Sequence, residues 1–198
     1  MKKTIKGVKS KFRSSAGELK SPLALSVCAM LLAVNIVLSY FGNVSITFLG
    51  TNVIKLTFTA IPIAVAAMLY GSVPAGIIGG LTDIIGFVLA PTGAYIPGFT
   101  ISMILMGFVY GAAFYNEKNT LPRILVAQTI VAVVISELLG SLWFVIFYGV
   151  PPLHALYVRG IKELVMFPII TAMFFALANI LQKLPEFKRL RKASKARQ

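Results

Sequence analysis

The charged residues of this chain gather at its two ends. Lys and Arg occur seven times in residues 1–20 and seven times in residues 183–198. The charged side chains of residues 21–182 are Lys55, Asp83, Glu117, Lys118, Arg123, Glu137, Arg159, Lys162 and Glu163. A stretch this long and this apolar cannot hide its surface in a water-soluble domain of its size, so the sequence predicts that its solvent is lipid. Each charge left inside then needs a partner or a function.

The apolar region divides into six segments, each near the length of about 20 residues that crosses a bilayer as a helix. Gly, Pro and Asn separate them. The segments cover approximately residues 22–41, 54–70, 73–90, 98–115, 121–148 and 153–182. The sequence therefore predicts an all-α integral membrane protein, a six-helix bundle with irregular external loops. The expected parts are a basic cytoplasmic or interfacial segment (1–20), the membrane domain (21–182) and a basic cytoplasmic tail (183–198).

The distribution of Lys and Arg predicts the orientation. Basic segments stay on the cytoplasmic side, so both termini are expected there, and an even number of spans satisfies this. The loop over residues 116–122 is then cytoplasmic and carries Lys118. The external loops over 42–53, 91–97 and 149–152 contain no Lys or Arg.

Three segments outside the spans have a composition of their own. Residues 1–20 place basic and apolar side chains on different helical faces, which suits an interfacial helix; a disordered tail is the alternative. Segments 42–53 and 90–99 mix Gly, Pro, Thr and Asn with β-branched or aromatic residues. Non-helical backbone at membrane depth is tolerated where it packs on protein or lines a cavity. Both are expected to be lids, the first as an irregular or extended strand, with plain connectors as the alternative.

Charges inside the spans mark a candidate binding site. Arg159 and Lys162 share a helical face in the outer half of the last span, with Glu163 one turn from Arg159. Two cations in an outward pocket suit an anionic ligand, whereas an internal Arg159–Glu163 ion pair is the alternative. Glu137 and Asp83 lie inside the fifth and third spans. Each carboxylate is expected to bind an amino-heterocycle, to pair with Arg159 or Lys162, or to cap a broken helix.

Several function classes lack their sequence signatures. The chain has no Walker A motif and no G-x-S-x-G, and its only histidine, His154, excludes a two-histidine metal site. The basic tails adjoin apolar spans, which favours contact with the lipid bilayer over nucleic acid. No enzyme activity, metal, cofactor or nucleic-acid partner is predicted.

A series of short Gly- and Pro-containing motifs runs through the middle of the chain. They are residues 61–62 (IP), 71–76 (GSVPAG), 79–86 (GGLTDIIG), 95–100 (YIPGFT) and 107–111 (GFVYG). Together with the length, the six spans and Ala29-x-x-x-Ala33, they resemble the substrate-binding S components of energy-coupling factor (ECF) vitamin transporters. The Pro-Gly-Phe-Thr run and the Arg159-x-x-Lys162-Glu163 run most resemble the folate-specific members.

The resemblance implies that the chain captures a vitamin, folate, at its external side. Delivery would then require a membrane coupling protein (the T component) and two cytoplasmic ATPases. The first-helix residues Ala29 and Ala33 would contact the coupling protein. The expected substrate-binding residues are Arg159, Lys162, Glu137, Asp83, Tyr95, Pro97, Gly98, Phe99 and Trp143. Arg159 and Lys162 are expected to hold the glutamate end of folate. The alternatives are an S component for another vitamin, such as pantothenate or riboflavin, and a membrane scaffold protein without a ligand.

Overall fold

The structure is a computed structural model, and it describes residues 12–41, 44–48, 51–56, 58–91, 95–117, 120–185, 187 and 189–191. A short helix over residues 12–18 comes first. The elements that follow are α2 (Pro22–Phe41), β1 (Val44–Phe48), β2 (Thr51–Leu56), α3 (Ala60–Tyr70), α4 (Ser72–Leu89), α5 (Pro97–Phe114), α6 (Leu121–Ile130), the π-helical η1 (Val131–Leu139), α7 (Gly140–Tyr148) and α8 (Pro152–Lys183).

The membrane domain is a helical bundle, as predicted. Within the described residues, 5 helical stretches are long and apolar enough to cross a membrane: Pro22–Tyr40, Ser72–Leu89, Pro97–Phe114, Leu121–Tyr148 and Pro152–Lys183. The apolar helix α3 is shorter than these. The segments α6, η1 and α7 continue one another and form the stretch Leu121–Tyr148.

The second predicted span, residues 54–70, begins too early. Residues 54–56 belong to β2, which pairs antiparallel with β1, and the helix starts only at Ala60. The run TNVIKL is rich in β-branched residues, which favour the pleated backbone of a strand over a helix. The segment 42–53, expected as an irregular or extended strand, thus contains β1 and the first half of β2, in a hairpin that reaches Leu56.

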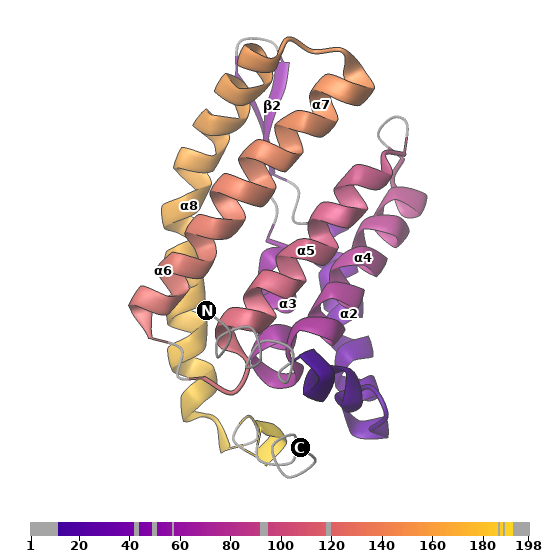
Figure 1. The fold of residues 1–198 in the computed structure, drawn as a ribbon, viewed down its shortest axis with the longest axis vertical. Helices are drawn as coiled ribbons and strands as arrows, with labels where there is room; N and C mark the ends of the chain where they lie inside the picture. Colours follow the sequence, from indigo (N-terminus) through magenta and orange to yellow (C-terminus); the bar gives the residue numbers. More distant parts are fainter. Residues whose placement is uncertain are drawn as a thin grey trace.

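The two ends of the bundle differ in what covers them. The hairpin lies at one end with the α7–α8 connection, and we call this the hairpin end (Figure 1). The helix over 12–18, the α5–α6 connection and the described residues after α8 lie at the opposite end, which we call the terminal end (Figure 1). Residues 1–11, which include most of the expected interfacial helix, lie outside the described residues, as do 92–94 of the second expected lid.

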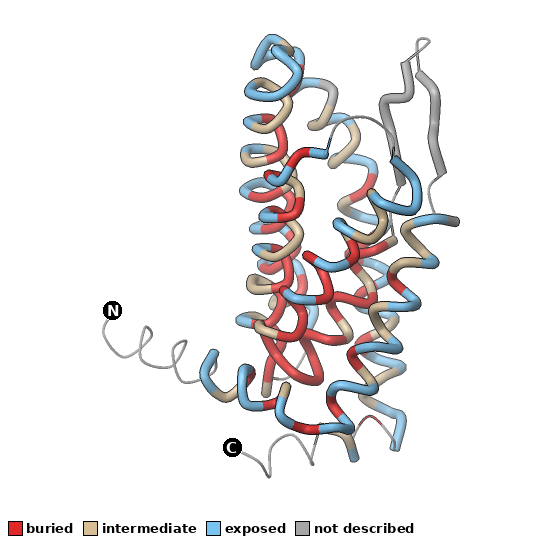
Figure 2. Tube along the Cα trace, turned by 90° about the vertical axis from the view of Figure 1, so that its right-hand side faces the viewer, coloured by how far each residue is buried: buried red, intermediate tan, exposed pale blue. Residues whose placement is uncertain are grey.

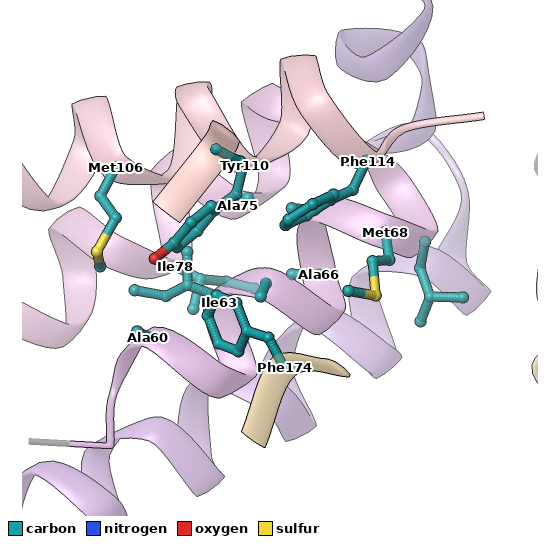
Figure 3. Close-up of a cluster of buried hydrophobic side chains, with 14 of the residues drawn as sticks. Ala60, Ile63, Ala66, Met68, Ala75, Ile78, Met106, Tyr110, Phe114 and Phe174 are labelled. Carbon is teal, nitrogen blue, oxygen red and sulfur yellow. The ribbon is translucent and has the colours of Figure 1, made fainter. Parts of the chain in front are cut away.

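The apolar core fills the half of the bundle nearer the terminal end (Figure 2). Tyr110 and Phe114 are fully buried, with their rings stacked 5.7 Å apart between centroids. The Phe174 ring of α8 stands edge-on to Tyr110 at 5.2 Å, and aliphatic side chains of α3 and α4 surround the group (Figure 3). Tyr110 donates a 2.8 Å hydrogen bond to the buried Gln128 of α6. Consequently α5, α6 and α8 pack together in the half of the bundle nearer the terminal end.

Helices α4 and α5 approach to backbone contact through small residues. A Cβ built on Gly107 would stand 2.5 Å from Ala75 backbone, and one on Gly111 would overlap Ser72. Close approach through small residues is the usual mode of helix packing in membranes. Gly107 and Gly111 are therefore used inside the bundle at this interface.

Ser15 joins the N-terminal helix to the turn between α3 and α4. Its buried hydroxyl donates to the Tyr70 carbonyl at 2.8 Å and accepts from the Val73 backbone N–H at 3.0 Å. These groups lie at the end of one helix and the start of the next, where the helices leave backbone groups unpaired. Gly71, between them, has φ 88° and no room for a side chain beside Ser15. The segment over 12–18 is thus packed on the bundle rather than separate from it.

Candidate substrate-binding site

Arg159 lies in the hairpin half of the bundle, between α8 and α7. Its guanidinium carbon stands 4.8 Å from the ring centre of Phe144 and 5.9 Å from that of Phe99. These two rings contact each other edge to face at 5.9 Å. The guanidinium also covers Gly140 so closely that a Cβ there would be 2.6 Å from its Cζ. A cation between two aromatic faces is stabilised by both ring quadrupoles.

The polar contacts of Arg159 and Glu163 run to the same residue of η1. Arg159 Nε donates to the Ser136 carbonyl at 3.3 Å, and the Ser136 side chain interacts with Glu163. Within the part of the chain that the structure describes, no ion pair joins Arg159 to Glu163. Lys162 is half-buried on α8, directly before Glu163. Arg159, Lys162 and Glu163 thus lie together in one group with Ser136.

Glu137 adds a second acid to this group. Both of its oxygens are buried, and neither has a hydrogen-bond partner among the described residues; the same holds for Ser141 Oγ, one turn along. Glu137 interacts electrostatically with Glu163, Arg159 and Lys162. It belongs to η1, and π-helical stretches inside α-helices occur frequently at functional sites. The charge cluster, as we call Glu137, Arg159, Lys162 and Glu163, therefore lies between η1 and α8.

Trp143 of α7 packs against the first turns of α5. Its indole lies on Gly98, where a Cβ would stand 2.6 Å from Trp143 Cε2. The indole N–H donates to Ser102 Oγ at 3.1 Å, and that hydroxyl donates to the Gly98 carbonyl at 3.0 Å. The absence of a side chain at Gly98 and the Ser102 bridge fix the position of the ring. Pro97 is exposed and occupies one of the first helical positions of α5.

Asp83 faces the other side of the first turn of α5. Its Oδ2 accepts a 2.5 Å hydrogen bond from the Thr100 hydroxyl. Since that hydroxyl has one proton, its 2.6 Å contact with Tyr95 requires the Tyr95 O–H to donate. The Tyr95 ring packs against Phe87 of α4 at 5.2 Å. Asp83 thus ties the residues before α5 to α4.

The first turn of α5 brings most of the expected site residues together. The Phe99 ring contacts the Arg159 guanidinium, the Trp143 indole packs on Gly98, and Thr100 donates a hydrogen bond to Asp83. The residues that sequence reasoning missed are Ser136, Gly140, Ser141, Ser102, Phe144 and Thr100. Thr100 could have been selected from the sequence, because it belongs to the Pro-Gly-Phe-Thr run. The contacts of Gly140 could not, because they depend on how α7 and α8 pack.

Ala29 and Ala33 are both exposed on α2, away from the charge cluster. Their neighbours toward the core are Cys28 and Asn35, which are buried. Asn35 donates to Thr82 of α4 at 2.9 Å and so fixes which face of α2 is turned to the bundle. The two alanines lie on the opposite, uncovered face.

The chain matches a known protein family along most of its length. The family model described as "ECF transporter, substrate-specific component" covers residues 24–184. The "Folate transporter FolT" of Clostridium novyi (strain NT) is 30% identical over 167 residues, which span 84% of this chain and 94% of that protein. The protein of the same name from Leuconostoc mesenteroides is 30% identical over 157 residues, or 76% and 82% of the two chains.

A solved structure has the same fold. It is described as "Crystal structure of FolT bound with folic acid", with a TM-score of 0.71 and 32% sequence identity. The match covers 80% of this chain and 94% of that chain. The chain belongs to the family of substrate-specific components of ECF transporters.

Proposed function

We propose that this chain captures folate in the hairpin half of its bundle and delivers it to an ECF importer. The observation that carries the proposal is the likeness, over most of both chains, to a FolT structure bound with folic acid. Two curated relatives named as folate transporters support the same substrate. The site is also chemically suitable, because it combines aromatic rings for a flat heterocycle with buried carboxylates and cations.

The proposed contacts of folate come from both sides of the first turn of α5. Phe99 and Trp143 offer ring faces, and the charge cluster offers hydrogen bonds and charge. On the opposite side of this turn, Asp83 and Tyr95 are both hydrogen-bonded to Thr100. Pro97 and Gly98 shape the backbone between the two sides. Apart from Glu163, these are the nine substrate-binding residues expected from the sequence.

The proposal includes the partners and the orientation. With several apolar helices and its family membership, the chain is a multi-pass protein of the cell membrane. Its relatives are transporter components rather than enzymes, and we propose that this chain likewise performs no catalysis. A T component would bind the Ala29/Ala33 face of α2, and two ATPases would supply the energy. Both termini would be cytoplasmic, which places the hairpin end outside.

Calorimetric titration of the purified full-length chain tests the substrate. Folate is expected to bind, and a saturating concentration of pantothenate or riboflavin is expected to leave the folate isotherm unchanged. Displacement of folate by either vitamin would indicate the broader or different specificity left open by the sequence. Absence of heat with all three would favour a scaffold protein.

A further inference from the structure

Arg191, in the segment that follows α8, carries a guanidinium that the protein satisfies only in part. Its Nη2 donates a 2.6 Å hydrogen bond to the Glu117 backbone carbonyl. Its Nε is buried and has no hydrogen-bond partner among the described residues. No carboxylate of the described residues forms an ion pair with Arg191, whereas the Glu117 carboxylate is paired with Arg123 at 2.6 Å. A buried charged donor without an acceptor is costly, and this favours an anionic ligand beside Arg191.

The packing of this segment holds Arg191 at a fixed place on the bundle. Phe187 is buried in the apolar core, and Leu190 packs against that core. Arg189 between them is exposed, and Arg191 is half-buried. The guanidinium is therefore positioned by its neighbours before any ligand arrives, which lowers the entropic cost of binding.

Arg191 lies at the terminal end, where the membrane-spanning helices begin and end (Figure 1). Helix α5 ends there at Phe114, the stretch Leu121–Tyr148 begins there, and α8 ends there at Lys183. Lipid headgroups lie at the level where spanning helices leave the hydrocarbon. The phosphate groups of one leaflet therefore surround this end of the bundle.

Basic side chains outnumber acidic ones at the terminal end. Within the described residues there, the basic ones are Arg13, Lys20, Arg123, Lys183, Arg189 and Arg191, and the acidic ones are Glu18 and Glu117. Both acids are at least half-buried, whereas Arg13, Lys20, Lys183 and Arg189 are exposed. Such a surface attracts phospholipids with a net negative charge more strongly than zwitterionic ones.

We infer that the terminal end binds an anionic phospholipid, whose phosphate oxygens accept hydrogen bonds from the Arg191 guanidinium. The planar fork of N–H groups on an arginine matches the oxygens of a phosphate. Exposed apolar side chains at the same end, those of Leu121, Ile180 and Leu184, offer a surface for the acyl chains. A soluble phosphate would make no use of that surface. This lipid site goes beyond folate capture and does not depend on it.

Native mass spectrometry of the full-length chain in detergent tests the site. The chain is titrated with phosphatidylglycerol or with phosphatidylcholine of the same acyl chains. The wild type is expected to hold one phosphatidylglycerol about tenfold or more tightly than phosphatidylcholine, because hydrogen bonds to charged groups are strong. Arg191→Gln is expected to lose this preference while binding phosphatidylcholine as the wild type does.

The matched control is Arg189→Gln, which removes the same charge from an exposed side chain of the same segment. It is expected to keep the preference for phosphatidylglycerol to within about threefold, because charges exposed to water contribute little. A second measurement separates a lipid from a soluble anion. Phosphatidylglycerol is expected to raise the melting temperature of the wild type, and inorganic phosphate alone is expected to leave it unchanged.

Three results overturn the inference. Equal binding of the two lipids by the wild type does so without any variant, so a folding defect in Arg191→Gln does not decide the matter. Equal losses in Arg189→Gln and Arg191→Gln would mean that the basic surface attracts anionic lipid as a whole and that Arg191 forms no site. A melting temperature raised as much by inorganic phosphate as by phosphatidylglycerol would identify a soluble anion as the ligand. The proposed folate function stands or falls separately, by titration with folate.

Discussion

The guanidinium of Arg159 in α8 covers Gly140 in α7, at a place where any side chain would collide with it. A Cβ on Gly140 would stand 2.6 Å from Arg159 Cζ and 2.9 Å from Nε. The contact lets the guanidinium reach the Ser136 carbonyl and both flanking rings at once. A glycine at this position is therefore a requirement for the position of the cation.

Gly140→Ala is expected to displace Arg159 and to weaken folate binding by about tenfold or more, because one charge-assisted contact is worth about 1.5–3 kcal/mol. Titration calorimetry measures the change. Gly160→Ala is the matched control, since a Cβ at Gly160 meets nothing within 4 Å. Equal affinity in the two variants would show that Arg159 can move aside without loss.

Gly98→Ala is expected to push the Trp143 indole off α5. The ring would lose its hydrogen bond to Ser102 and become more exposed, and overpacking of this kind costs about 1–3 kcal/mol. Because Trp143 is the only tryptophan of the chain, its fluorescence reports on this site alone. A red-shifted emission maximum and a lower melting temperature are the expected results. Gly17→Ala, where a Cβ has open space, should leave both unchanged.

Ser15→Ala is expected to reduce stability without changing folate affinity. The substitution removes the hydroxyl that binds the Tyr70 carbonyl and the Val73 backbone N–H, and the loss of these two hydrogen bonds costs about 1–3 kcal/mol. Thermal unfolding in detergent measures the loss. Ser26→Ala is the control, because the Ser26 hydroxyl is exposed and bonds only within its own helix, to Pro22. A melting temperature equal to that of the control would mean that the N-terminal helix does not stabilise the bundle.

The helical architecture could be predicted because it follows from where the charges are absent. Apolar runs of bilayer length, separated by Gly and Pro, locate most helices to within one or two residues of their observed bounds. The hairpin was harder to place. Its second strand carries Val53, Ile54 and Leu56, whose hydropathy extends the apolar signal of α3 toward the N-terminus. Hydropathy measures burial in lipid and does not separate a strand from a helix.

The residues of the candidate site were selected by type, and their contacts could not be predicted. Rarity of charge within the spans was enough to select Arg159, Glu137 and Asp83. Which of them meet depends on the rotation and depth of each helix, and these are set by packing in the core. The π-helical backbone around Glu137 leaves no mark in hydropathy, because the same side chains would suit an α-helix. The hydrogen bond between Ser15 and Tyr70, which lie far apart in the sequence, likewise depends on packing and could not be predicted.

The orientation of the bundle is testable with single cysteines in a Cys28→Ser background. Val150→Cys, between α7 and α8, is expected to react with a membrane-impermeant maleimide in intact cells. Lys183→Cys, at the end of α8, is expected to react only after permeabilisation. The reason is the concentration of Lys and Arg at both termini, whereas residues 42–53, 91–97 and 149–152 contain neither and β2 adds only Lys55. The reverse labelling pattern would place the hairpin end in the cytoplasm.

Replacing both Ala29 and Ala33 with Trp is expected to abolish folate uptake while leaving folate binding to the isolated chain nearly intact. The two alanines lie on the uncovered face of α2, and their small size permits a neighbouring helix to approach closely. Two indoles there would hold a T component away without touching the charge cluster. Uptake by cells that express the complete importer, compared with calorimetry on the purified chain, separates the two effects. Val126→Trp, at an exposed position of α6, serves as the control for bulk facing lipid. If the double variant loses binding as well as uptake, the alanines act on the fold of the bundle, and the partner surface must be sought on another helix.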